Sequence, residues 1–209
     1  MVIPFLTPLR TLNIETLPES LRNTLTHQSN TRIYVEESIA EAFLEGLKQA
    51  FAGWTSLQGD PGDAKTVIGT LADAQQTKNV TSLIEIAKKE GKLVIGGDGQ
   101  GAYIKPTIFT DVADNAKINT TEVFGPVMVY HTFKTEEEVL KRANDTEYGL
   151  YSSVFTSNLD RALQFSRKLE SGMVGINTAS PSLHFDVPFG GWKQSGYGKE
   201  MGRHWVESW

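Results

Sequence analysis

The apolar residues of this chain follow a strand-like pattern first and a helical pattern next. Residues 31–35 predict a short strand, and a helical stripe follows for which Ser38 is the expected N-cap. That stripe consists of Phe43, Leu44, Leu47 and Phe51. Residues 54–65, with a Gly-Asp-Pro-Gly turn signal, predict a loop. A second stripe predicts a helix over roughly residues 72–91.

A glycine-rich run separates the next two predicted strands, at residues 92–95 and 103–109. The run, Gly96–Gly101, could be taken for a loop that cradles phosphate. A dinucleotide-binding loop needs a helix N-terminus directly after it, whereas here a second strand follows. We therefore predict a hairpin turn.

Strands and helices alternate regularly in the second half of the chain. Strands are predicted at residues 127–133, 153–156 and 173–177. Thr135, with Glu138 three residues later, predicts a capping box, and Asn158 is the expected cap of the next helix. This alternation favours a parallel sheet with right-handed crossovers, and the fold class is therefore α/β.

Composition narrows the class of protein. A chain of 209 residues has room for one domain, and a 39% hydrophobic and 22% charged composition is that of an ordinary soluble protein. A net charge of −5 without a basic block does not indicate nucleic-acid binding. No apolar run reaches the length of a membrane span, and the N-terminus is a poor secretory signal, so we expect a cytoplasmic protein. Residues 1–26, with prolines at 4, 8 and 18, predict irregular structure.

The chain contains no cysteine, which excludes disulfides, thiolate metal sites and cysteine nucleophiles. Its four histidines lack the spacing of metal ligands, so no metal site is expected.

Two segments carry the most specific signals. Residues 121–127 read Thr-Glu-Val-Phe-Gly-Pro-Val, and residues 188–202 read Pro-Phe-Gly-Gly-Trp-Lys-Gln-Ser-Gly-Tyr-Gly-Lys-Glu-Met-Gly. The first could be only a turn before a strand, or it could offer a carboxylate to a ribose diol beside an aromatic ring. In the second, interleaved aromatic and polar residues favour an ordered loop over a flexible tail.

In this order, the two segments resemble the C-terminal catalytic domain of the aldehyde dehydrogenase superfamily. The resemblance extends over about residues 31–207, through Thr-Arg-Ile-Tyr-Val at 31–35 and Gly-Leu at 149–150. It implies an aldehyde dehydrogenase-like catalytic domain at residues 27–178. Residues 179–209 would form the wall of the substrate tunnel and a glycine-rich segment of the same domain, whereas residues 1–26 match nothing in the family.

The resemblance also assigns roles to single residues. Glu122 and Phe124 correspond to the pair that holds the nicotinamide ribose. The predicted substrate pocket consists of Leu183, Phe185, Phe189 and Lys193.

Three parts of the family's machinery have no counterpart here. The family's nucleophile is a thiolate, and its position falls at or next to His27. The dinucleotide-binding domain is not represented, and the chain stops at Trp209, where the family continues into an oligomerisation strand. We therefore expect no cofactor, with NAD only as a weak vestige at Glu122 and Phe124, and no working NAD-dependent dehydrogenase.

Three functions stay open. The first is a repurposed, cofactor-free enzyme that performs isomerase-, cyclase- or lyase-type acid/base chemistry on a carbonyl-containing small molecule, for example in secondary metabolism. Its candidate acids and bases are His184, Asp186, His27, Glu122 and Lys193, with Asn177 as a donor to an oxyanion. The second is an interaction module that self-associates or binds a full-length relative through an uncovered apolar face. The third is a residual aldehyde oxidoreductase.

Overall fold

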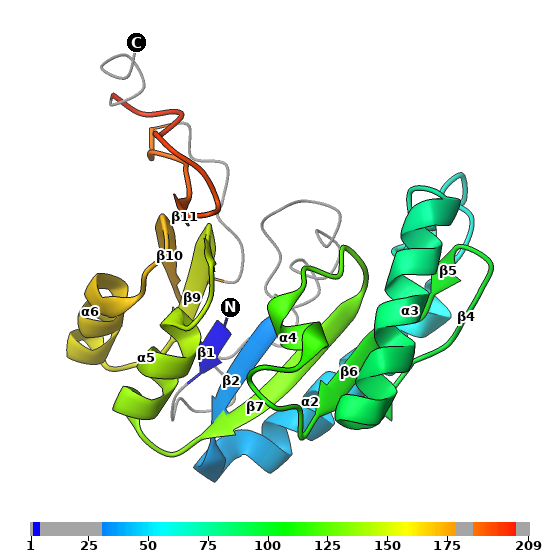
Figure 1. Ribbon diagram of the computed structural model, residues 1–209, viewed down its shortest axis with the longest axis horizontal. Helices are drawn as coiled ribbons and strands as arrows, with labels where there is room; N and C mark the ends of the chain where they lie inside the picture. The colour runs from blue at the N-terminus through cyan, green and yellow to red at the C-terminus, as the bar shows by residue number, and fades with distance from the viewer. Residues whose placement is uncertain (1, 5–30, 179–185, 204–209) are drawn as a thin grey trace.

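A seven-stranded sheet forms the centre of the computed structural model (Figure 1), which describes residues 2–4, 31–178 and 186–203. The strand order is β10-β9-β1-β2-β7-β6-β3. Six strands run parallel and β3 alone runs antiparallel to its neighbour. The strands are β1 (Val2–Pro4), β2 (Arg32–Glu36), β3 (Lys92–Ile95), β6 (Thr107–Thr110), β7 (Val127–Phe133), β9 (Tyr151–Phe155) and β10 (Met173–Ile176). The α/β class with a parallel sheet is thus confirmed.

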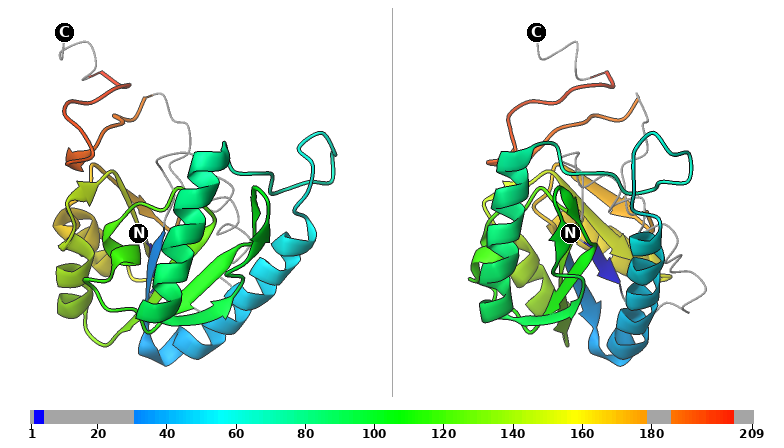
Figure 2. Two further views of the ribbon diagram at one scale, coloured as in Figure 1. Left: turned by 45° about the vertical axis from the view of Figure 1, so that its right-hand side comes forward. Right: turned by 90° about the vertical axis from the view of Figure 1, so that its right-hand side faces the viewer.

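Helices cover both faces of the sheet, as the two views of Figure 2 show. One face carries α2 (Glu37–Ser56), and the other carries α3 (Ala74–Glu90), α5 (Glu136–Asn144) and α6 (Leu159–Lys168). The short helix α4 (Lys117–Thr120) precedes β7 on the second face. Two small two-stranded sheets complete the fold: β4 (Gly99–Gln100) with β5 (Tyr103–Ile104), and β8 (Tyr148–Gly149) with β11 (Trp192–Lys193). Among the described helices, none combines the length and the apolar character needed to cross a bilayer.

The helix α2 is held by its buried face. Phe43, Leu47 and Phe51 are fully buried and pack on Ile33 and Val35 of β2. This confirms most of the predicted stripe. Two details of the prediction were wrong. The helix begins at Glu37, so Ser38 lies inside its first turn and is not the cap, and it continues to Ser56 instead of ending before residue 54.

The other predicted caps are confirmed by hydrogen bonds. The Thr135 side chain accepts from the backbone N–H of Glu138, and Asn158 accepts from that of Arg161. The Glu138 carboxylate reaches back to the N–H of Lys134, one residue before the cap. At α3, the cap is Asp73, which accepts from Gln76.

The predicted hairpin is confirmed in a more elaborate form. β3 pairs antiparallel with β6, and between them the glycine-rich run leads into the small β4–β5 hairpin. The expectation that residues 1–26 are irregular was wrong for residues 2–4. These form β1, which lies between β9 and β2 near the middle of the sheet. Residues 5–26 lie outside the described part of the chain.

Candidate functional site

A cleft of about 830 Å³ opens at the amino-terminal ends of the parallel strands. Arg32 at the start of β2, Tyr151 at the start of β9 and Ser171 just before β10 line it. At the opposite edge, β2, β7 and β9 lead into α2, α5 and α6, so that edge is occupied by helix starts (Figure 1). A cleft of this volume lies within the usual range for small-molecule sites.

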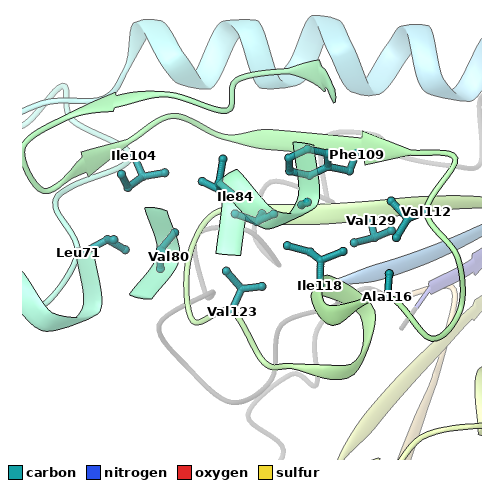
Figure 3. Packing of buried hydrophobic residues seen from close by; sticks show 12 residues of the cluster. Leu71, Val80, Ile84, Ile104, Phe109, Val112, Ala116, Ile118, Val123 and Val129 are labelled. Carbon is teal, nitrogen blue, oxygen red and sulfur yellow. The ribbon is translucent and has the colours of Figure 1, made fainter. Parts of the chain in front are cut away.

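One wall of the cleft is the end of α4 together with the segment that joins it to β7. Its residues Asn119, Thr120, Thr121 and Glu122 line the cleft, and Glu122 is exposed. The segment is anchored at both ends, because Ile118 and Val123 are buried in the cluster under α3 (Figure 3). Glu122 is thus an exposed carboxylate between two fixed points of the core.

The turn after Glu122 is held by α3. The side-chain amide of Gln76 donates to the backbone oxygens of Val123 (3.1 Å) and Phe124 (2.9 Å). Phe124 has a φ of 51°, a conformation that costs a non-glycine residue energy and persists only where its surroundings impose it. At Gly125, a Cβ would lie 2.9 Å from the methyl carbons of Val80, so the approach of this turn to α3 requires a glycine.

A chain of hydrogen bonds from α5 holds the helix α4 in place. The Arg142 guanidinium donates to both carboxylate oxygens of Asp114 and to Nδ1 of His131 (3.2 Å). Arginine can only donate, so His131 carries its proton on Nε2 and donates it to Oδ1 of Asn119 (3.2 Å). The ring of His131 also stacks on Tyr34. Burial, together with the nearby Arg142, lowers the pKa of His131 to about 4, so the imidazole is neutral near pH 7.

The facing wall joins β8, β9 and the segment after residue 186. The hydroxyls of Ser152 and Ser171 share a hydrogen bond across β9 and the start of β10. The hydroxyl of Ser195 accepts from the N–H of Gly149 (2.9 Å). Phe189 also lines the cleft, and its backbone exchanges two hydrogen bonds with Glu200. These contacts hold the C-terminal segment against the cleft.

The structure brings two of the predicted site residues together. Glu122 and Phe189 line the same cleft, and Phe124 lies two residues beyond Glu122. Lys193 is not among the residues that line this cleft. Its ammonium donates to the backbone oxygens of Asn144 and Thr146 and pairs with Glu170, which does line it.

The other predicted residues lie apart from the cleft or outside the described chain. The Asn177 side chain accepts from the Thr156 N–H (2.9 Å) and donates to the Thr156 oxygen (3.1 Å), so it joins the ends of β9 and β10. Asp186 is exposed and is not among the residues that line the cleft. His27, Leu183, His184 and Phe185 fall outside the described residues.

Sequence reasoning did not single out Arg32, Ser152 or Ser171. In the sequence, Arg32 has no signal beyond its place in the predicted strand at residues 31–35, and the two serines belong to no motif. They meet because the amino-terminal ends of parallel strands lie at one edge of a sheet, and that edge becomes defined only once strand order is known.

The fit of a nicotinamide cofactor can be tested against the same residues. An exposed Glu122 with the half-buried Phe124 beside it fits one ribose and the ring attached to it. The pyrophosphate would need a helix N-terminus after a glycine-rich turn, and Gly96–Gly101 leads into the β4–β5 hairpin instead. Within the described residues, the fit is therefore limited to the ribose end.

Comparisons with known proteins agree with this architecture. The sequence model of the aldehyde dehydrogenase family matches residues 28–209. Retinaldehyde dehydrogenase 3 of Mus musculus is 46% identical over 178 residues, which are 83% of this chain and 34% of that protein. The NADP/NAD-dependent aldehyde dehydrogenase PuuC of Escherichia coli is 42% identical over 181 residues, 86% of this chain and 36% of that protein.

Solved structures show the same likeness. The aldehyde dehydrogenase KauB of Pseudomonas aeruginosa superimposes with a TM-score of 0.91 and 35% identity over 99% of this chain and 43% of its own. Betaine aldehyde dehydrogenase of Staphylococcus aureus, solved with NAD+, gives 0.91 and 29% identity, again over 99% of this chain and 42% of its own. The chain spans about a third of the length of the curated relatives it matches. With the family's sequence pattern and its fold both present, this chain belongs to the aldehyde dehydrogenase family.

Proposed function

We propose that the chain binds a carbonyl-containing small molecule in the cleft and acts on it by acid/base chemistry, with Glu122 as the group that takes and returns the proton. The observation that carries this proposal is the placement of Glu122. Its exposed carboxylate stands on a fixed turn in a cleft of about 830 Å³ that Phe189 also lines. A carboxylate within reach of a bound carbonyl compound is a suitable general base.

The proposed step needs no oxidant. The C–H bond next to the carbonyl breaks and its proton passes to Glu122. The electron pair of that bond forms a C=C bond, while the π pair of the carbonyl moves onto the oxygen and gives an enolate. The cleft offers hydroxyl and amide groups to that oxygen. Return of the proton to a different atom completes an isomerisation. His27, His184 and Asp186 remain candidates for a second acid or base.

The absence of cysteine supports this choice over dehydrogenase chemistry. None of the 209 residues supplies a thiol, and covalent capture of an aldehyde by this family needs a thiolate. A residual aldehyde oxidoreductase would form NADH or NADPH from an aldehyde. Continuous absorbance assays with both cofactors test that alternative directly.

The test of the main proposal is a thermal-shift screen with NAD, NADP and a panel of aldehydes and ketones. A ligand present at about one hundred times its Kd adds about 2.7 kcal/mol to the free energy of unfolding, which gives a clear rise in Tm. We expect a rise with carbonyl compounds, and loss of their conversion in Glu122→Gln. The matched control is Glu41→Gln, an exposed carboxylate on α2 at the other face of the sheet. Equal conversion by both variants would reject Glu122 as the base.

An interaction module is the second candidate, and the exposed aromatic side chains of the C-terminal segment favour it. Trp192 is 53% exposed, and Tyr197 is fully exposed beside it. Large apolar side chains grouped at a surface often mark an interface. Light scattering over a range of protein concentrations tests self-association. A mass that stays monomeric in the wild-type chain, and that a Trp192→Ser variant does not change, would reject self-association through this surface.

A further inference from the structure

We infer that Arg32 at the floor of the cleft forms a subsite for a carboxylate, so that the molecule bound there is an oxo acid, with a carbonyl group and a carboxylate on one short carbon chain. This inference rests on the proposed function, because it names the substrate class of the same cleft. It starts from the position of Arg32, the first residue of β2, on the amino-terminal edge of the sheet.

The direction of the Arg32 side chain follows from strand alternation. Successive residues of a strand point to opposite faces, so Arg32 shares a face with Tyr34, while Ile33 and Val35 pack under α2. Burial raises the pKa of the Tyr34 hydroxyl, and the nearby Arg32 side chain opposes that rise. The Arg32 guanidinium thus lies near the Tyr34 hydroxyl, and Arg32 lines the cleft.

Within the described part of the chain, Arg32 differs from its neighbour Arg142 in its ion pairs. Arg142 lies over the same Tyr34 ring, and its charge is balanced by ion pairs with Asp114 and Glu138. None of the ion pairs among the described residues includes Arg32. Both guanidinium groups act on His131, which stays neutral. Arg32 is therefore a half-buried cation in a cleft that the carboxylates of Glu122 and Glu170 also line.

A carboxylate suits this position better than a neutral group. A guanidinium presents two parallel N–H groups that match the two oxygens of a carboxylate, and such charge-assisted pairs are the strong hydrogen bonds of proteins. Thr31 and Thr121 also line the cleft, and their hydroxyls offer further polar contacts. The carboxylate of Glu122 lies in the same cleft, and it would repel a second anion but accept a proton from a carbonyl compound. An oxo acid thus meets the cation with one end and the base with the other.

The experiment compares three probes of nearly equal size at matched ionic strength. They are 4-oxopentanoate, with a carbonyl and a carboxylate; 2-pentanone, with the carbonyl alone; and pentanoate, with the carboxylate alone. We expect 4-oxopentanoate to bind about ten- to a hundredfold more tightly than 2-pentanone, as the rise in Tm against concentration measures. Arg32→Met should remove this preference. Arg32→Lys should keep only part of it, because lysine retains the charge but lacks the two parallel N–H groups of the guanidinium. Glu170→Gln removes an opposing charge that lines the cleft and should tighten binding of 4-oxopentanoate.

The outcomes separate the subsite from the proposed function. If 2-pentanone binds as tightly as 4-oxopentanoate, the carboxylate subsite is wrong while carbonyl binding stands. If pentanoate binds as tightly as 4-oxopentanoate and Arg32→Met abolishes both, the subsite stands and the carbonyl part fails. Equal shifts by all anions, inorganic sulfate included, or no shift with any probe, would overturn the inference. If Arg32→Met does not fold, Arg32→Lys decides, because it keeps the positive charge and removes only the guanidinium fork.

Discussion

The two faces of the central sheet are built from alternate residues of the same strands, and they differ in chemistry. On one face, Ile33 and Val35 lie under the single long helix α2 in an apolar cluster. On the other, Arg32 and Tyr34 lie under shorter helices among charged and hydroxyl groups, at the edge of an open cleft. One strand thus contributes to stability through one set of side chains and to the candidate site through the other set.

The two faces also differ in the polar contacts that they contain. On the α2 face, the Tyr130 hydroxyl donates to the Ala40 oxygen (2.7 Å). The α5 face contains the Arg142 group, in which each polar atom has a partner and the side chains of His131 and Asn119 are fixed in one orientation. Fully satisfied networks of this kind hold side chains in place, and here the side chain held is next to the cleft.

The largest expected effect is on the α2 face. Phe43 is fully buried, and Phe43→Ala should lower the free energy of unfolding by about 3–5 kcal/mol because it removes apolar contacts and leaves a cavity. Urea denaturation measures the change. Glu41→Ala, on the exposed side of the same helix, should stay within about 0.5 kcal/mol of the wild type. A loss at Phe43 no larger than that of the control would show that α2 is not the main contact of this face.

On the other face, we expect stability to depend on pH through His131. Its pKa is about 4 in the folded chain, because burial and the Arg142 and Arg32 charges outweigh the nearby Asp114, and about 6.5 when unfolded. Above pH 6.5 both states are neutral at this ring. Between pH 6.5 and 4 only the unfolded chain takes up the proton, so stability falls by about 1.4 kcal/mol per pH unit and roughly 3 kcal/mol in all.

The measurement is a set of urea denaturation curves between pH 4 and 7 for the wild type and His131→Gln. Subtracting the two series cancels the carboxylates that titrate in both proteins. The wild type should lose stability more steeply than the variant as the pH falls. Parallel curves would mean that His131 is not held neutral in the folded chain.

A smaller effect is expected from Arg142→Lys. Lysine keeps the charge but cannot donate to both oxygens of Asp114 while also reaching His131, so we expect a loss of about 1–2 kcal/mol. Arg167→Lys, an exposed position on α6, is the matched control and should change stability by less than about 0.5 kcal/mol. Similar losses of stability in the two variants would show that the guanidinium of Arg142 does not hold Asp114 and His131 as proposed.

Much of the fold could be predicted from the sequence, because its elements have local signals. The stripe of α2, the caps Thr135 and Asn158, and the strand–helix alternation after residue 127 are all readable within a few residues. The strand β1 is different: it has three residues, and its partners on β9 lie about 150 positions away, so no local pattern announces it.

The site was predictable only in part, for a related reason. Glu122 and Phe189 stand in segments with a recognisable sequence pattern, and the structure places both in the cleft. Lys193 and Asn177 stand beside such patterns too, yet their polar atoms bind backbone groups of α5's end and β9. Which polar side chain faces a cavity and which one ties the backbone is decided by the direction of the chain, and a sequence pattern does not contain that direction.

The smallest expected change in stability concerns the first turns of α5 and α2, which lie on opposite faces of the sheet. The helix α5 buries little apolar surface, through Val139 and Ala143, and its first turn depends on the bond from the Glu138 N–H to Thr135. Thr135→Ala should therefore cost about 1 kcal/mol. The helix α2 begins without a side-chain cap and is held by packing, so Ser38→Ala should change stability by less than about 0.5 kcal/mol. Thermal denaturation of both variants gives the comparison. Equal losses would mean that Ser38 caps α2 after all, and that its first turn begins later than Glu37.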